Sequence, residues 1–342
     1  MDGEGICAGE YMVETKGITD DMSNNILILS CGTRDLLVRY FKRADYERVI
    51  GADCSELAPA LYEADKYYLI PRMKEEGYFD AILEICRKEG ITAILPLQED
   101  ELNLISENRE LFEQEGIRTI VSPVETLQIC RDKYCFFEHM TEHGIPVLNS
   151  YIDLAEFEKV YEAGKIGFPV FVKPVRGAGS VGVMKVSCME LLKALFAYSE
   201  EPLLIQEFCN GREFGIDVYV DLVSGEVVDI FAKEKLRMRA GETEKSVTSN
   251  DPALKEFVYR AASTLKLSGP VDMDVFEKDG IFYLSEINPR FGGGFPHAYA
   301  CGVDTPSYIL QNLQGIANES HLQEKREEIY VLKYSDILCI DR

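Results

Sequence analysis

Short apolar runs alternate with helix-like stretches over the first third of the chain. Residues 25–30, 48–51 and 93–95 are apolar runs, and residues 78–88 and 99–115, before and after the last of these runs, carry apolar side chains at helical spacing. Runs that are apolar throughout are typical of parallel strands buried on both faces. The pattern therefore predicts repeated strand–helix units, which is an α/β arrangement.

The pattern changes after a predicted helix that ends near Gly144. Residues 212–221 and 227–235 are longer strand-like runs joined by a short polar loop, and this spacing predicts an antiparallel hairpin. Residues 270–276 and 281–288 flank an Asp-Gly pair, which is a strong hairpin signal. For the last 26 residues or so the sequence predicts only a packing role.

Composition narrows the class of protein. The chain has 342 residues, 46% of them hydrophobic, and a formal charge of -23. That length suggests two or three domains, and the acidity argues against nucleic acid or an anionic membrane as a partner. The start shows neither a basic segment followed by an apolar one nor any stretch of membrane-spanning length. Ten scattered cysteines without a Cys-x-x-Cys pair predict reduced, mostly buried thiols and a cytoplasmic protein.

A glycine-rich loop follows an apolar strand that ends in Lys173. The loop contains Gly177, Gly179 and Ser180, and glycines let backbone N–H groups approach a polyphosphate closely. Lys173 and Arg176 add positive charge there. A plain tight turn is the alternative, and the lysine at the strand end favours phosphate binding. A second loop, residues 31–34, also follows an apolar strand, but it has a single glycine, so a structural turn is favoured over a phosphate contact.

Oxygen-bearing side chains cluster on two predicted neighbouring strands. Asp272 and Asp274 share one face of the first strand, and Glu286 and Asn288 share one face of the second. Adjacent buried carboxylates repel each other unless a cation lies between them. With Arg290 just beyond, the set predicts a magnesium site that bridges phosphates.

These motifs, in this order, resemble the ATP-grasp superfamily, most closely the branch with carbamoyl phosphate synthetase large subunits, biotin carboxylase and D-alanine–D-alanine ligase. The resemblance covers residues 110–315 or so, and the region before it resembles the Rossmann-like domain that precedes such a module. It implies α/β and α+β architecture, with a Rossmann-like N-terminal domain followed by a two-lobed ATP-grasp fold. The implied domains are a Rossmann-like domain, a small lobe with a glycine-rich lid, a large lobe with the magnesium site and a C-terminal packing segment, at residues 24–122, 123–205, 206–315 and 316–342.

The resemblance also assigns roles to individual residues. The residues implied to bind the nucleotide are Lys133, Lys173, Arg176, Gly177, Gly179, Ser180, Glu207, Phe208, Cys209 and Glu213. Lys133 and Lys173 would contact phosphates, Glu207 and the backbone at Phe208 and Cys209 the adenine, and Glu213 the ribose. Taken without the resemblance, the two glutamates are better interpreted as solvated charges at strand ends.

The same resemblance implies a metal set and a group at the transferred phosphate. Asp274, Glu286 and Asn288 would hold one or two Mg²⁺, for which Mn²⁺ is a substitute, and Asp272 is a rival for the place of Asp274. Arg290 would steady the transferred phosphoryl group.

Basic residues and histidines near these motifs add further candidates. Arg237 and Arg239 belong to a run of four basic residues within seven and are expected to meet the γ-phosphate and an acidic substrate, with a solvated loop as the alternative. His139 and His143 are predicted at surface or packing positions. His297 follows the glycine triplet, where packing is favoured over substrate contact.

The function implied is an ATP- and magnesium-dependent carboxylate–amine ligase that forms an acyl phosphate. Its expected partners are a small-molecule carboxylate and an amine, with an amino-acid or peptide-like acid favoured by family prevalence, and a homodimer is compatible with this reading. The alternatives are a kinase-like ATP-grasp phosphotransferase and a nucleotide-binding regulatory protein. The chain has room for one ATP-grasp module, whereas carbamoyl phosphate synthetases use two.

Overall fold

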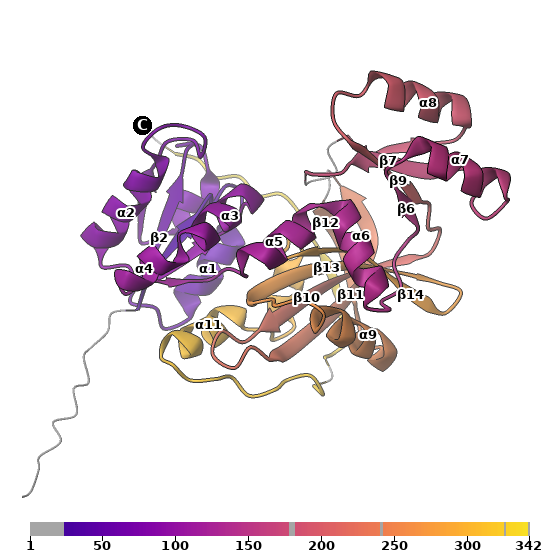
Figure 1. Cartoon of the computed structure of the whole chain (residues 1–342). Coiled ribbons are helices and arrows are strands. Elements are labelled where there is room, and N and C mark those ends of the chain that lie inside the picture. The colour runs from indigo at the N-terminus through magenta and orange to yellow at the C-terminus, as the bar shows by residue number, and fades with distance from the viewer. Residues whose placement is uncertain (1–23, 178–181, 240–241, 325, 341–342) are drawn as a thin grey trace, which may run out of the picture.

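The structure is a computed structural model that describes residues 24–177, 182–239, 242–324 and 326–340. Three sheets organise it: one of five strands near the N-terminus, one of four and one of six. Figure 1 shows the five-stranded sheet on the left, the six-stranded sheet in the lower centre and the four-stranded sheet at the upper right. We call them the N-terminal unit, the large sheet and the small lobe, respectively, with the helices that cover each.

The N-terminal unit is a parallel sheet with the strand order β3-β2-β1-β4-β5. Its elements are β1 (Asn25–Leu29), α1 (Asp35–Arg43), β2 (Arg48–Asp53), the 3-10 helix η1 (Pro59–Glu63), β3 (Lys66–Leu69), α2 (Tyr78–Glu89), β4 (Ala93–Pro96) and β5 (Arg118–Thr119). In β1, Ile26 and Ile28 join the core on the α1 side, while Leu27 and Leu29 join the core on the α2 side. A strand buried on both faces must be apolar throughout, and the predicted Rossmann-like arrangement is confirmed.

The helical pattern predicted over residues 99–115 is confirmed, and it forms two helices. They are α3 (Glu99–Glu107) and α4 (Arg109–Gln114), which meet at Asn108. The side-chain amide of Asn108 donates to the carbonyl of Leu104 at 2.8 Å. Asparagine competes with the backbone for such bonds, and this weakens a helix at that position.

The small lobe is an antiparallel sheet with the strand order β6-β9-β7-β8. Its elements are β6 (Ser150–Tyr151), α7 (Leu154–Glu162), β7 (Val170–Pro174), β8 (Met184–Val186), α8 (Met189–Tyr198) and β9 (Leu203–Glu207). Its buried apolar side chains, such as Phe157 and Leu192, form a core separate from the other cores. The lobe is thus a small body of its own.

The large sheet has the strand order β14-β13-β10-β11-β12-β15, with every pairing antiparallel. Its strands are β10 (Arg212–Val220), β11 (Val227–Arg239), β12 (Glu242–Ser249), β13 (Gly269–Lys278), β14 (Ile281–Asn288) and β15 (Tyr330–Leu332), and the nearby helices are α5 (Val124–Arg131), α6 (Lys133–Glu142), α9 (Pro252–Ala262), α10 (Phe295–Ala300) and α11 (Thr305–Leu313). One face packs against α6 and α9, with Ile216 and Val218 inward. From the other face, Tyr219 and Phe231 share a core with the N-terminal unit. The large sheet therefore holds the N-terminal unit in place by apolar packing.

Both predicted hairpins are confirmed, with two corrections at the far edge of the large sheet. Strand β11 continues to Arg239 and pairs with β12, so the basic run lies on a strand and does not open a loop. The segment expected only to pack contributes β15, which pairs with β12 through residues 330–332. Lys333 then forms an ion pair with Glu242.

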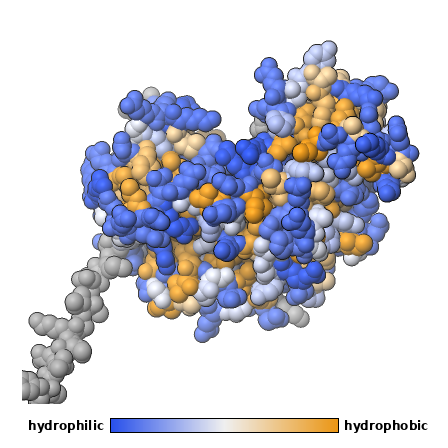
Figure 2. Space-filling view, in the orientation of Figure 1, coloured by the Kyte–Doolittle hydropathy of each residue, from blue (hydrophilic) through white to orange (hydrophobic). Residues whose placement is uncertain are grey.

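The surface is hollowed between the N-terminal unit and the small lobe (Figure 2). In the part of the chain that the structure describes, no helix is long and apolar enough to cross a membrane. The nine described cysteines are unpaired, as predicted. The expectation that most are buried is wrong, because only Cys31, Cys86 and Cys209 of these nine are buried.

Candidate active site

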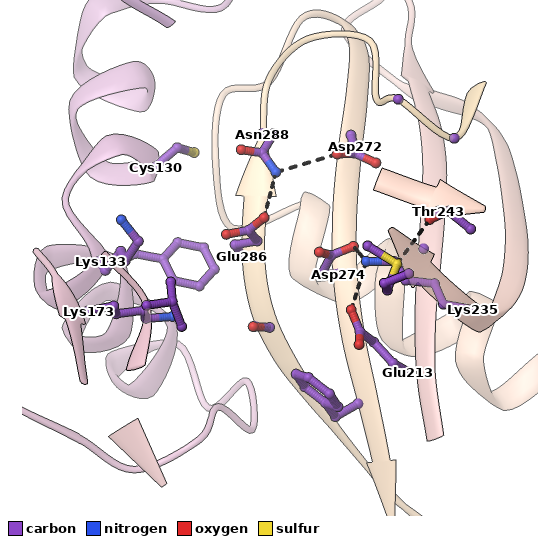
Figure 3. A pocket seen from close by; sticks show the side chains of 18 of the residues that line it. Cys130, Lys133, Lys173, Glu213, Lys235, Thr243, Asp272, Asp274, Glu286 and Asn288 are labelled. Carbon is purple, nitrogen blue, oxygen red and sulfur yellow. Dashed lines mark hydrogen bonds and ion pairs between the residues drawn. The ribbon is translucent and has the colours of Figure 1, made fainter. Parts of the chain in front are cut away.

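A cavity of about 450 Å³ lies where the small lobe, the large sheet and the N-terminal unit meet. This volume is within the usual range of small-molecule sites. Figure 3 shows its two opposed walls. Lys133 and Lys173 lie on one side, and the polar side chains of β13 and β14 lie on the other.

The first wall carries two lysines without anionic partners. The ammonium of Lys173, at the end of β7, is buried and donates to the side-chain carbonyl of Gln206 at 2.9 Å. The ammonium of Lys133, at the start of α6, donates to the backbone carbonyl of Gly177 at 2.7 Å. Burial lowers the pKa of Lys173 to about 8 and also lowers the pKa of Lys133. Among the described residues neither ammonium has a carboxylate within ion-pair distance, so both are free to meet phosphate oxygens.

The second wall is fixed by the register of one hairpin. Asp272 lies opposite Asn288, and Asp274 lies opposite Glu286. The side-chain amide of Asn288 donates to Glu286 at 3.0 Å and lies 3.5 Å from Asp272. The predicted oxygen cluster therefore exists as a geometric unit, drawn with its dashed contacts in Figure 3.

Asp274 lies between a cation and further carboxylates. Burial raises its pKa to about 7, helped by Glu286 and Asp272 and opposed by Lys235. The ammonium of Lys235 is 2.6 Å from Asp274 and 2.8 Å from Glu213. Burial alone would lower the pKa of Lys235, but these two carboxylates outweigh it and raise the pKa.

The donor chemistry of this wall fits a magnesium ion. The cluster offers carboxylate oxygens and one amide oxygen, which are hard ligands. A divalent cation beside Asp274 and Glu286 would relieve the repulsion that raises the pKa of Asp274. In the described part of the chain no three His, Cys, Asp or Glu side chains form a metal-binding group, so the site needs the amide oxygen of Asn288.

Arg290 and the glycines after it close the far end of the cavity. The guanidinium of Arg290 lies 3.5 Å from Asp272 and donates to the carbonyl of Phe291 at 2.9 Å. A Cβ at Gly292 would lie 2.3 Å from Oδ1 of Asp272, and a Cβ at Gly294 would lie 2.6 Å from Cε of Lys233. A side chain at either glycine would therefore displace Asp272 or Lys233.

Of the four residues expected to contact the base and the ribose, three line the cavity. Glu207, Cys209 and Glu213 all line the cavity. Glu207 accepts a hydrogen bond from Asn149 at 2.7 Å. Phe208 is not among the described residues of the cavity wall, and its ring packs 5.5 Å from that of Phe171.

Arg237 and Arg239 do not line the cavity, contrary to the prediction. Both are exposed and form ion pairs with Glu244, at 2.8 and 3.4 Å. The pairing of β11 with β12 shifts register on both sides of Arg237, and this places Met238 in the cavity wall instead. Bulges of this kind re-aim side chains, and the sequence pattern carries no signal for this one.

The residues of the predicted phosphate-binding loop do not all lie at the cavity. Gly177 lines the cavity. Arg176 does not: it is exposed, and its Nε lies 3.2 Å from Asp132. Gly179 and Ser180 lie outside the described residues.

Sequence reasoning did not single out several wall residues with polar or cationic side chains, although Lys233 and Lys235 belong to the predicted basic run. Gln206, Lys233 and Lys235 come from strands whose alternation points them inward, a signal that could have been used. Arg34 comes from the N-terminal unit, in the loop favoured as a structural turn.

The histidines follow the packing prediction. His297 is buried, and its ring nitrogens are hydrogen-bonded to Ser246 at 2.7 Å and Thr248 at 3.0 Å. Burial lowers its pKa to about 4. His139 and His143 stack on each other with 4.2 Å between ring centres, away from the cavity wall.

Known families match two parts of the chain. Residues 26–120 match the PylC-like N-terminal domain, and residues 199–337 match the family described as ATP-grasp in the biosynthetic pathway with Ter operon. The D-alanine–D-alanine ligase of Ruminiclostridium cellulolyticum is 31% identical over 187 residues, which are 48% of this chain and 50% of that one. The carbamoyl phosphate synthase large chain of Methanothrix thermoacetophila is 24% identical over 79% of this chain and 26% of its own length.

Solved structures show the same fold. The biotin carboxylase domain of the Hydrogenobacter thermophilus 2-oxoglutarate carboxylase, solved with MgADP, ADP and bicarbonate, superposes with a TM-score of 0.70 at 20% identity. The match covers 88% of this chain and 72% of that one. The sheet topology, the two family matches and the relatives together place this chain in the ATP-grasp superfamily. It spans 18%, 26% and 54% of the lengths of three curated relatives.

Proposed function

We propose that this protein is an ATP- and magnesium-dependent ligase that activates a carboxylate for attack by an amine. One observation supports this most strongly: two lysines that have no ion-pair partner among the described residues face a cluster of carboxylates across a single cavity. A polyphosphate needs cations on one side and a metal held by oxygen ligands on the other. We further propose that the division of the chain follows domain limits near residues 122, 205 and 315.

In the proposed reaction, a substrate carboxylate oxygen forms a bond to the γ-phosphorus of ATP while the bond to the β-phosphate oxygen breaks. The products are ADP and an acyl phosphate. An amine then attacks the carbonyl carbon, phosphate leaves, and the amine loses a proton to solvent, which yields an amide. Neither step needs a nucleophile from the protein, so positioning and electrostatic stabilisation are its main contributions.

Each wall has a role in that scheme. Lys133 and Lys173 bind the phosphate oxygens, and Arg290 steadies the group in transfer. Asp274, Glu286 and Asn288 would hold magnesium, which neutralises charge on the phosphates when bound. Glu207 and Glu213 orient the base and the ribose.

The substrate class follows from the relatives only as part of this proposal. D-alanine–D-alanine ligases join amino acids, as their name states, and such a ligase is 31% identical over about half of each chain. We therefore favour an amino-acid or peptide-like acid as the carboxylate substrate.

The test is ADP release from MgATP in the presence of pooled amino acids and dipeptides, with product masses recorded. ADP formation coupled to a condensed product supports the ligase. ADP formation with a phosphorylated product and no dependence on amine identifies the kinase-like alternative. Calorimetry with a non-hydrolysable ATP analogue completes the test, because absence of magnesium-dependent binding contradicts the nucleotide site itself.

A further inference from the structure

Arg34 brings a cation from the N-terminal unit into the cavity. It lies in the loop between β1 and α1 and shares the cavity wall with Arg290 of the large sheet. Burial lowers the pKa of Arg34, and the charge of Arg290 lowers it further. The two guanidinium groups therefore share one cavity wall, near enough for the charge of one to act on the other.

The guanidinium of Arg34 lacks a partner among the described residues: no hydrogen bond or ion pair reaches it. Glu242 and Asp272 act on it only at a distance, and each has a cation of its own. Glu242 is paired with Lys333, and Asp272 lies 3.5 Å from Arg290. A desolvated charge without a partner is costly, so a fold that retains one gains by binding an anion there.

The position of Arg34 just after strand β1 also favours contact with a ligand. From β1 the chain adds β2 and β3 on one side and β4 and β5 on the other. In open α/β sheets, ligands bind at the carboxyl ends of the strands where the order reverses. Arg34 follows β1, Glu99 follows β4, and both line the cavity. The switch point of the N-terminal unit thus opens into the candidate active site.

The backbone beneath Arg34 leaves space for a ligand. An added Cβ at Gly293 would lie 3.6 Å from Nη1 of Arg34 and 3.5 Å from the carboxylate of Glu242. These are ordinary contact distances, so a Cβ there would displace neither group, unlike one at Gly292 or Gly294. The missing side chain leaves room for a small group beside Nη1 of Arg34.

We propose that Arg34 and Arg290 together bind a carboxylate of the acid substrate, so that the N-terminal unit supplies half of the substrate site. This inference rests on the proposed ligase function and names its substrate end. Two guanidinium groups can hold a carboxylate through paired hydrogen bonds, which single lysines cannot. The γ-phosphate of ATP is the other oxyanion that could reach them, and the experiment separates the two.

The experiment is calorimetry on the whole chain with Mg²⁺ and the ATP analogue AMP-PNP at saturation, so that the γ-phosphate position is filled. Succinate, a dicarboxylate probe, is then titrated into the wild type and the variants Arg34→Gln, Arg34→Lys and Arg39→Gln. Arg39 is the matched control, because it lies on α1, the helix that directly follows Arg34, and pairs with Glu63 on the surface. Loss of a charge-assisted pair predicts succinate binding weakened by at least ~10-fold in Arg34→Gln. We expect a smaller loss in Arg34→Lys and none in Arg39→Gln.

Three results overturn the inference. These are no succinate binding by the wild type, unchanged succinate binding by Arg34→Gln, and a loss in that variant of AMP-PNP affinity but not of ADP affinity. The last would assign Arg34 to the γ-phosphate. If the wild type binds AMP-PNP with magnesium and one of these results appears, only the inference fails. If the wild type binds no nucleotide, the proposed function fails first.

Discussion

The small lobe and strand β11 both bring buried lysines to the same cavity, but they treat the charge in opposite ways. Lys173 of the small lobe donates to a neutral amide, and burial lowers its pKa to about 8. Lys233 of β11 forms an ion pair with Asp217. Lys235 of the same strand forms ion pairs with Asp274 and Glu213. The protein itself neutralises the lysines of β11, whereas no described carboxylate lies within ion-pair distance of Lys173.

This difference separates two kinds of cation at one site. A lysine that is already paired stabilises the wall and fixes the carboxylates around it. A buried lysine without an anion raises the free energy of the empty protein, and a bound phosphate lowers it again. The charge balance of each lysine is thus a better guide to its role than its distance from the cavity. Five experiments test this difference and the site around it.

The largest effect is expected at the carboxylate wall. Glu286→Gln keeps the shape of the side chain but removes the charge that would hold magnesium. Magnesium-dependent ADP release should fall by roughly 1,000-fold, as for loss of a main electrostatic contact, while the melting temperature stays close to that of the wild type. Glu277→Gln is the control, because Glu277 lies on the same hairpin and pairs with Arg212. Full activity in Glu286→Gln would remove this residue from the metal set.

Lys233→Met tests whether the β11 lysines are structural. Lys233 is 1% exposed, and its removal leaves the buried Asp217 carboxylate without its cation. Breaking a buried pair costs about 3 to 5 kcal/mol, so the free energy of unfolding should fall by that amount in urea denaturation. The double variant Lys233→Met with Asp217→Leu should recover most of the loss. A single variant as stable as the wild type would contradict the comparison.

Lys173→Met should have the converse result. Removing a buried, unpaired cation leaves stability unchanged or raises it, while ADP affinity falls by about 10- to 100-fold through the lost charge-assisted contact. Calorimetry and thermal melting measure the two effects on one sample. Lys193→Met is the control, since Lys193 pairs with Glu158 on the outside of the small lobe. Unchanged ADP affinity in Lys173→Met would make the glycine-rich hairpin a structural turn.

The pH dependence of ADP binding should show the same lysine. The ammonium of Lys173 is charged below its pKa of about 8 and neutral above it. Affinity for ADP is therefore fully present below pH 8 and falls as pH rises through that value, with the midpoint moved upward because a bound phosphate favours the charged form. The fall should be absent in Lys173→Met. An identical profile in both proteins would exclude Lys173 as its cause.

The smallest effects are expected at the two arginines that the bulge turns outward. Arg237→Gln and Arg239→Gln each remove an exposed ion pair with Glu244. Such pairs contribute at most about 1 kcal/mol, and ADP release should stay within about twofold of the wild type. A loss above tenfold in either variant would mean that this end of β11 turns its arginines toward the substrate.

The sequence predicted those parts of the fold in which apolar and polar residues follow a regular pattern. The apolar run of β1 indicates a strand buried on both faces, and the Asp-Gly pair indicates the hairpin between β13 and β14. The alternation of polar side chains along those two strands indicates which residues share a face. The same alternation predicted that Glu286 and Asn288 share a face, and the hairpin register then set them against Asp274 and Asp272.

What sequence could not supply depends on single contacts between distant segments. The bulge beside Arg237 follows from how β11 meets β12, and the strand around Val331 follows from a pairing nearly ninety residues away in the chain. Arg34 is the clearest case. Its loop has no glycine fingerprint, and Arg34 reaches the cavity wall only because a shared core sets the N-terminal unit against the large sheet.

Because the small lobe has a core of its own, we expect it to unfold locally while the rest of the protein stays folded. Its buried apolar side chains, among them Phe157, Val170 and Ile205, are not continuous with the three larger cores. A body held by few apolar contacts opens by itself at a lower free energy than the whole chain, and its amide hydrogens exchange sooner. Any nucleotide held between Lys173 and the large sheet would couple the two bodies, so its first visible effect should be slower amide exchange across β7 and β9.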